Sequence, residues 1–206
     1  RSFSGYETER LWRNDGLRSF REVAAQSGLE TARDGRGIAV VDLDNDGDLD
    51  VVLANQDQAP QVFRNRTIDS RVAVDPGDAA NHWLRVDLET APSTGVNRDG
   101  IGTRVVIQAG DRLFVRERDG GNGFSGQSDP RLHFGLGEVD RIDLIEVRWP
   151  DGRFQHWDDV AVDQALRLAQ DPTQLTDSTR IELPPVDGVS VGPAGPELPA
   201  IDLEAA

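Results

Sequence analysis

Short runs of apolar and β-branched residues, separated by Gly, Asp and Pro, recur along most of the 206-residue chain. Runs of this length between turn-forming residues are typical of β-strands rather than of helices. In the first third of the chain they predict strands at Phe20–Val23, Gly37–Val41, Val51–Asn55 and Gln61–Arg64. Residues Ala24–Gly28 are compatible with a single helical turn.

The middle of the chain has a second, denser set of strand signals. Residues Arg141–Trp149 alternate apolar and charged positions apart from one double apolar step, which predicts a half-buried strand with one wet face. Turn signals at Ala109–Arg112 and Pro150–Arg153 lie between strand pairs. About seven short strands within some ninety residues favour a β-sandwich. These strands are expected at Trp83–Leu88, Thr103–Ala109, Leu113–Arg118, Arg131–Phe134, Ile142–Trp149, Phe154–Trp157 and Ala165–Leu168.

An internal repeat indicates how the first strands are arranged. The tetrapeptide Leu11–Asn14 recurs as Val62–Asn65, 51 residues later. Repeats of about 40–50 residues, built of short strands and Gly/Asp-rich turns, are typical of β-propeller blades. The chain is therefore expected to hold the last strand of one blade and one complete blade. Since a propeller needs about four to eight blades to close, we expect the remaining blades in the parent protein or in a partner chain.

Charge and proline content divide the chain into three predicted parts. Residues 1–75 contain the blade, and residues 76–170 contain the sandwich. Residues 171–206 carry one Arg against seven acidic residues, together with six of the eleven prolines. Such a composition predicts an extended acidic tail that cannot fold alone, although a tail lying along the surface of a partner domain is the alternative.

Composition narrows the classes of partner and chemistry. All 22 basic residues are Arg, the net charge is −15, and Cys and Met are both absent. Without Cys there can be no disulfide and no Cys-ligated zinc. The acidic balance argues against nucleic-acid and anionic-membrane partners, and no apolar run is long enough to span a bilayer. A chain that lacks Met is expected to be part of a longer protein.

The sharpest chemical signal is an acidic loop between two predicted strands. Carboxylates at loop positions 1, 3, 5 and 9, with Gly at position 6, form a pattern that can wrap around a hard cation. The side chains of Asp42, Asp44, Asp46 and Asp50 are the expected ligands, with Asp48 contributing its main-chain carbonyl. Oxygen-only ligands favour Ca²⁺ over zinc or copper, and an all-protein cage disfavours Mg²⁺.

This loop is not an EF-hand, because Leu53 stands where the bidentate Glu would be and the flanks are strands. The competing interpretation is a solvated acidic turn, which the mutual repulsion of five carboxylates makes unfavourable without an ion. Nothing nearby is nucleophilic or basic, so we expect a structural ion rather than a catalytic one.

These residues resemble a known family. Gly37–Asn55, followed by the Val-Phe-Arg-Asn strand, is similar to an FG-GAP/VCBS repeat, the calcium-binding blade of integrin-like propellers. Residues Asn97–Gly102, Gly126–Gly137 and Val147–Gly152 resemble the ASPIC/UnbV domain of the cartilage acidic protein and enediyne UnbV-like groups. Residues Ser4–Glu7 are similar to the segment that leads into the terminal repeat.

The resemblance implies a secreted or surface-exposed calcium-binding protein, located outside the cell, at its surface or in the periplasm. Its expected function is calcium-stabilised recognition, in which the propeller face or the sandwich loops contact a protein or glycan. The alternative is an enzyme or accessory protein of enediyne-type natural-product biosynthesis, with its site on the propeller or at the blade–sandwich junction. No catalytic residue can be assigned.

Other candidate sites are weaker. The histidines His82, His133 and His156 are too scattered for a metal site, and packing or hydrogen-bonded edge roles are expected. The polar loop Gly120–Asp129 and the segment Asn97–Asp99 can be interpreted as a shared ligand site, but capped turns are favoured. No phosphate-binding loop and no hydrolase nucleophile motif is present.

Overall fold

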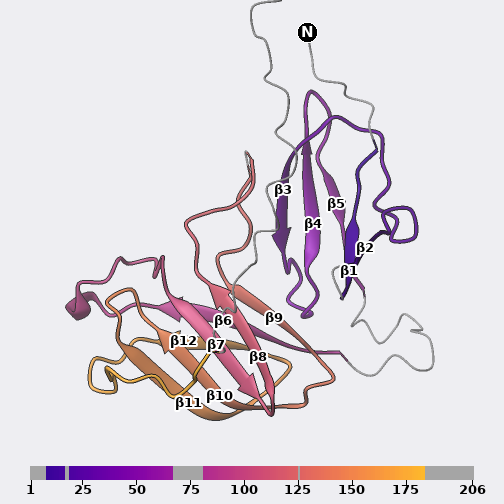
Figure 1. Ribbon diagram of the computed structural model, residues 1–206. Coiled ribbons are helices and arrows are strands. Elements are labelled where there is room, and N and C mark those ends of the chain that lie inside the picture. The colour runs from indigo at the N-terminus through magenta and orange to yellow at the C-terminus, as the bar shows by residue number, and fades with distance from the viewer. Residues whose placement is uncertain (1–7, 17–18, 67–80, 125, 184–206) are drawn as a thin grey trace, which may run out of the picture.

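The computed structural model describes residues 8–16, 19–66, 81–124 and 126–183, and these form an all-β protein (Figure 1). Twelve strands make four sheets, and one 3-10 turn spans Pro92–Thr94. None of the described helical segments has the length and apolar character needed to cross a membrane. The predicted fold class, a blade-like β unit followed by a β-sandwich-like domain, is confirmed.

The N-terminal unit consists of a hairpin and a three-stranded sheet. Strand β1 (Trp12–Gly16) pairs antiparallel with β2 (Ser19–Glu22). Strands β3 (Gly35–Val41), β4 (Asp50–Asn55) and β5 (Gln61–Phe63) form an antiparallel meander.

The sequence pattern assigns β2 to the same blade as β3, β4 and β5. In the structure β2 pairs with β1. A short connection closes the β1–β2 hairpin at little entropic cost, while twelve residues separate β2 from β3. The helical turn expected at Ala24–Gly28 is present, since the Ser27 N–H donates to the Val23 carbonyl over 3.0 Å.

All seven strands predicted for the second unit are present, with ends shifted by a few residues. One sheet has the order β12-β6-β9 and the other β11-β10-β7-β8. The first sheet contains β6 (His82–Glu89), β9 (Leu132–Gly137) and β12 (Gln164–Ala169), of which β6 and β12 are parallel. The second contains β7 (Arg104–Ala109), β8 (Arg112–Glu117), β10 (Arg141–Arg148) and β11 (Phe154–Ala161).

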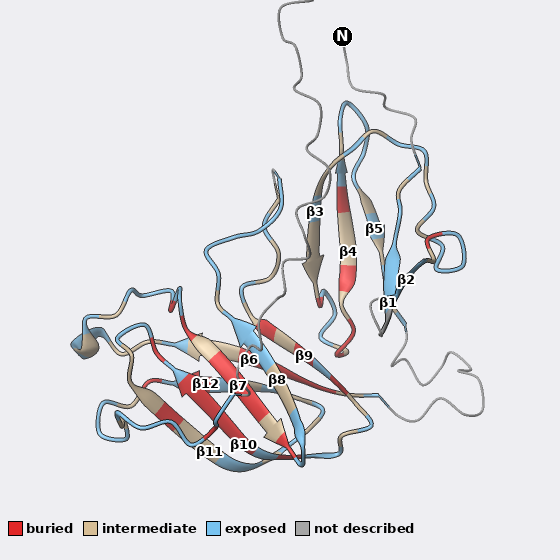
Figure 2. Cartoon of the chain, viewed as in Figure 1, coloured by how far each residue is buried: buried red, intermediate tan, exposed pale blue. Residues whose placement is uncertain are grey.

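The core lies between these two sheets, and Figure 2 shows the buried residues concentrated in their strands. Alternate residues of each strand face inward, which is why apolar and polar positions alternate in the sequence. Fully buried side chains include Phe134 from the first sheet and Trp149, the residue that follows β10. The core residues are Leu84, Val86, Val105, Ile107, Leu132, Phe134, Leu136, Ile142, Ile145, Val147, Trp149 and Leu168.

The described start of the C-terminal segment packs on the sandwich. Residues 171–183, predicted as the start of an extended tail, lie against the outer face of the four-stranded sheet. Thr176 exchanges two backbone hydrogen bonds with Phe154, of 2.7 and 2.9 Å. Ile181 is 5% exposed and packs with Val106 and Leu144. The described part of the tail therefore covers the sandwich, and residues 184–206 lie outside the described residues.

Candidate metal centre

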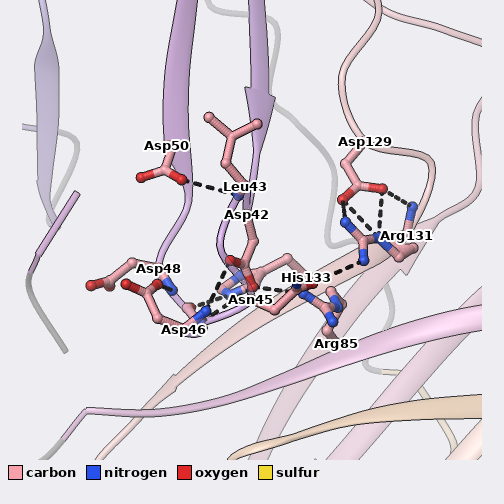
Figure 3. A network of polar contacts seen from close by, with 11 residues as sticks. Asp42, Leu43, Asn45, Asp46, Asp48, Asp50, Arg85, Asp129, Arg131 and His133 are labelled. Atoms are coloured by element: carbon pink, nitrogen blue, oxygen red, sulfur yellow. Dashed lines mark hydrogen bonds and ion pairs between the residues drawn. The ribbon is translucent and has the colours of Figure 1, made fainter. Parts of the chain in front are cut away.

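The acidic loop joins β3 to β4 and points toward the sandwich (Figure 3). Asp42 follows the last residue of β3, and Asp50 is the first residue of β4. Positive φ angles at Asn45 (60°) and Gly47 (97°) reverse the chain within the loop. Two left-handed residues so close together explain why the turn contains Asn and Gly at these positions.

The loop brings three of the five predicted ligands together. Carboxylate oxygens of Asp42, Asp44 and Asp46 all lie within 4.8 Å of one another. Three hard oxygen donors at this spacing suit a hard divalent cation such as Ca²⁺. Asp42 is buried, Asp46 is partly buried and Asp44 is exposed, so the group is open on one side.

The other two predicted ligands, Asp48 and Asp50, form hydrogen bonds within the loop and with its surroundings. The carboxylate of Asp50 accepts hydrogen bonds from the backbone N–H groups of Leu43 (3.0 Å) and Asn65 (2.8 Å). These bonds tie the start of the loop and the chain beyond β5 to the base of β4. Asp48 is buried, and its N–H donates to Asp46 Oδ1 over 3.0 Å. Their proposed coordination stays a prediction.

Two arginines partly neutralise the loop. Arg64, just beyond β5, forms ion pairs with Asp44 and Asp46, and its side chain is 41% exposed. Arg85 on β6 pairs with Asp42 Oδ2 over 2.7 Å, and both side chains are almost fully buried. Asp42 also accepts hydrogen bonds from the N–H groups of Asp46 (3.2 Å) and Gly47 (3.3 Å), so three donors hold its carboxylate, two from the loop and one from the sandwich.

The sandwich domain contacts the tip of the loop directly. A Cβ atom on Gly47 would lie 2.2 Å from the indole ring of Trp83, so only glycine fits there. The Gly47 carbonyl accepts a hydrogen bond of 2.8 Å from His133 Nε2, which must therefore carry the proton. The rings of Trp83 and His133 stack with an interplanar angle of 6°. A cleft of about 460 Å³ opens beside this contact and is also lined by Asp48 and Asn65.

A second contact joins the β8–β9 connection to the free edge of β3. The Val40 N–H donates to Ser128 Oγ over 3.1 Å, and the Asp129 N–H donates to the Val40 carbonyl over 3.0 Å. Gly126 approaches β3 so closely that a Cβ atom would lie 2.3 Å from the Ile38 carbonyl oxygen. The described residues of this polar loop thus lie along the blade. In the segment Asn97–Asp99, the side chain of Asn97 accepts a hydrogen bond of 2.8 Å from the Ile101 N–H, as expected for a capped turn.

Asp129 and Arg131 stiffen this second contact. Burial raises the pKa of the Asp129 carboxyl, but hydrogen bonds from the side chain and backbone of Arg131 outweigh burial and hold that pKa below its ordinary value. Arg131 also donates to Asn45 Oδ1 in the acidic loop over 3.4 Å. The carboxylate therefore stays ionised and keeps Arg131 oriented toward the loop.

The other two histidines have hydrogen-bonded edge roles, as expected from the sequence. His82 Nδ1 lies 2.7 Å from Asp163 Oδ2, and His156 Nε2 lies 2.9 Å from Glu146 Oε2. Sequence reasoning missed the residues that contact the acidic loop, namely Trp83, Arg85 and His133. In the sequence these three residues occupy the positions of predicted strands that face away from the core. Residues that face solvent occupy the same positions, so the pattern does not distinguish the two.

Comparison with known proteins identifies two domains in the chain. Residues 3–53 match the family model of the FG-GAP-like repeat, and residues 93–175 match the model described as ASPIC and UnbV. The chain therefore carries an FG-GAP-like repeat followed by an ASPIC/UnbV domain, as its sequence motifs suggested.

The similar curated proteins are cartilage acidic protein 1 from three vertebrates. The chain is 33% identical to the Mus musculus protein over 136 residues, which cover 64% of this chain and 19% of that protein. It is 36% identical to the Xenopus tropicalis protein over 126 residues, covering 58% of this chain and 17% of that protein. The Homo sapiens protein is 33% identical over 136 residues, covering 64% and 18%. The chain thus spans less than a fifth of the length of these relatives.

Proposed function

We propose that the chain is the calcium-stabilised part of an extracellular recognition protein, and that the ion has a structural role. The observation that carries this proposal is the convergence of the Asp42, Asp44 and Asp46 carboxylates at one turn. Calcium would offset their repulsion and fix the β3–β4 turn against the sandwich. The extracellular location is proposed from the family and from the relatives, whose name is that of an acidic protein of cartilage.

The rest of the loop is compatible with an ion at this place. Gly47 lets the backbone pass close to Trp83, and Asp50 fixes the ends of the loop without occupying the cluster. Arg64 is half exposed, and an ion pair of that kind contributes little to stability, so the side chain can yield to a divalent cation. The bound ion would add charge neutralisation, while the protein residues orient the carboxylates.

The N-terminal unit exposes several large apolar side chains. Trp12, Phe20 and Val62 are each more than half exposed. Large apolar side chains at the surface of a sheet often mark a contact with another element. We propose that further blades of the parent protein, or of a partner chain, cover these residues. A protein or glycan ligand would then meet the complete propeller face or the sandwich loops.

The first experiment tests calcium binding on the whole chain. Isothermal titration should show Ca²⁺ binding with a Kd of about 10⁻⁴–10⁻³ M, the range typical of extracellular modules. Calcium at 100 times Kd adds about 2.7 kcal/mol to the free energy of unfolding. The melting temperature should then rise by about 5–10 °C and return to its starting value on chelation.

Matched variants assign the effect to the loop. Asp44→Asn removes one converging carboxylate and should abolish most of the calcium-dependent rise. Asp111→Asn changes an exposed carboxylate in the β7–β8 turn and should leave the rise intact. Excitation of Trp83 beside the loop should also sensitise the luminescence of bound Tb³⁺. A chain that shows no heat of binding and no change of melting temperature with calcium would refute the proposal.

A further inference from the structure

We infer that the ASPIC/UnbV domain and the acidic loop form one coupled unit, in which cation binding and docking of the domain on the blade strengthen each other. This inference rests on the proposed calcium site. The contact is made by Arg85 together with residues 126–133, which we call the clasp. The ligand class is a divalent cation, and the partner of the clasp is the β3–β4 loop of the same chain.

The register of the first sandwich sheet places the clasp. Arg85 on β6 lies directly opposite His133 on β9, and Trp83 lies opposite Gly135. Directly opposite residues of an antiparallel pair project from the same face of the sheet. Their neighbours Leu84, Val86 and Phe134 face the core, so Trp83, Arg85 and His133 project outward together. This outward face is the one that the acidic loop contacts (Figure 3).

The clasp contacts act on the loop that the ion would also fix and on the strand that enters it. Arg85 reaches Asp42, the first residue of the converging group, and His133 reaches the carbonyl of Gly47 at the reversal of the loop. Ser128 and Asp129 hold β3 just before the loop begins, through both backbone polar groups of Val40. The clasp therefore constrains the entry, the first ligand and the tip of the loop.

The energetics favour all-or-none behaviour. The Arg85–Asp42 pair is buried on both sides, so separating the two units would leave each charge to be resolvated or unpaired. A cation that gathers Asp42, Asp44 and Asp46 fixes the same turn that presents the Gly47 carbonyl to His133. Two ligands that favour one conformation of a shared element are reciprocally coupled. Here the two ligands are calcium and the ASPIC/UnbV domain, and the shared element is the acidic loop.

The contacts of the clasp also explain a sequence motif of the sandwich. The segment Gly126–Gly137 carries part of the resemblance to the ASPIC/UnbV domain, yet only its alternate residues are needed for the core. Gly126 permits the close approach to β3, and Ser128, Asp129, Arg131 and His133 all reach the blade or its loop. The polar half of the motif thus faces the repeat.

The test compares calcium affinity in clasp variants of the whole chain. His133→Ala removes the donor to Gly47 and should raise the Kd for Ca²⁺ by about 5–20-fold, within the usual range of coupling between sites. His133→Gln retains a side-chain N–H donor and should restore much of the affinity. His82→Ala is the matched control, because His82 lies on the same sheet but bonds to Asp163 rather than to the loop.

A second readout follows the docking itself. Amide hydrogen exchange at Val40 should slow on addition of calcium in the unaltered chain and respond less in His133→Ala. Should His133→Ala not fold, Ser128→Ala removes a different clasp contact and should also weaken calcium binding. Clasp variants that fold and keep the unaltered Kd within twofold would overturn the coupling alone. Failure of the unaltered chain to bind calcium would overturn both this inference and the proposed function.

Discussion

Gly47 meets two separate requirements at one position of the acidic loop. Its φ of 97° lies in the left-handed region, where a side chain is strained, and its α-carbon faces the Trp83 ring at a distance that leaves no room for a methyl group. The sequence pattern supplied the first reason, because Gly at position 6 permits the reversal. Only the packing of another domain supplied the second.

Replacing Gly47 by alanine should therefore cost more than backbone strain alone. Gly28→Ala is the matched control, since Gly28 has a φ of 72° and nothing within 4 Å of the added methyl group. We expect Gly28→Ala to lower the free energy of unfolding by about 1–2 kcal/mol, and Gly47→Ala by a further ~1–3 kcal/mol of overpacking. Denaturant unfolding measures both. Equal losses would show that the contact with Trp83 is not required.

At the scale of elements, the outer face of the four-stranded sheet is closed by a segment without any strand signal. Residues 179–181 are hydrogen-bonded there to one buried carboxylate, that of Glu146 on β10. Its hydrogen bonds come from the Arg180 N–H (2.5 Å), the Thr179 hydroxyl (2.8 Å), His156 Nε2 (2.9 Å) and the Ile181 N–H (3.2 Å). Burial raises the pKa of Glu146, but these bonds outweigh it and lower the pKa below its ordinary value.

This arrangement predicts a defined acid sensitivity. Because the pKa of Glu146 is lower in the folded chain, its stabilisation is complete above about pH 4.5 and is lost as the pH falls further. Glu146→Gln should lower the free energy of unfolding at pH 7 by about 2 kcal/mol, the value of hydrogen bonds to a charged acceptor. It should also make the free energy of unfolding less dependent on pH below pH 4.5. Glu138→Gln, at an exposed turn, should change neither. If Glu146→Gln loses stability below pH 4.5 as steeply as the unaltered chain, Glu146 is not the source of the acid sensitivity.

The strands themselves could be read from the sequence to within a few residues. Alternation marks them because one face of each sheet is buried, and Gly, Asp and Pro mark their ends. Pairing across the tight turns at Ala109–Arg112 and Pro150–Arg153 could also be read, but pairing between strands distant in the sequence could not. The parallel β6–β12 pair joins residues about eighty positions apart, and Ile181 packs on Val106 and Leu144, which come from two different strands. Neither contact has a local signature.

At the scale of the whole molecule, a net charge of −15 with no Lys acts against compactness. Part of that charge is balanced locally, since Arg85 and Arg64 pair with the acidic loop. The remaining repulsion acts over long distances and is screened by salt. Raising NaCl from about 0.01 to 0.15 M shortens the screening length from about 30 to 8 Å.

We therefore expect NaCl to raise the melting temperature by a few degrees, and calcium to raise it further at matched ionic strength. The comparison separates general screening from binding at one site. Thermal unfolding in NaCl, MgCl₂ and CaCl₂ of equal ionic strength measures both contributions. A melting temperature that falls with NaCl would mean that attractive charge pairs, rather than net repulsion, dominate the electrostatics of this chain.

The sequence by itself determined that this protein is all-β, where its strands lie, and which loop carries the carboxylates, because these features follow from short-range periodicity and spacing. The tertiary structure alone decided which carboxylates converge and what holds them. Asp42, Asp44 and Asp46 converge at one turn, while Asp50 binds backbone N–H groups at the base of the loop. Arg85 and His133 reach the loop from strands far along the chain, and contacts of that kind exist only once the sheets have packed.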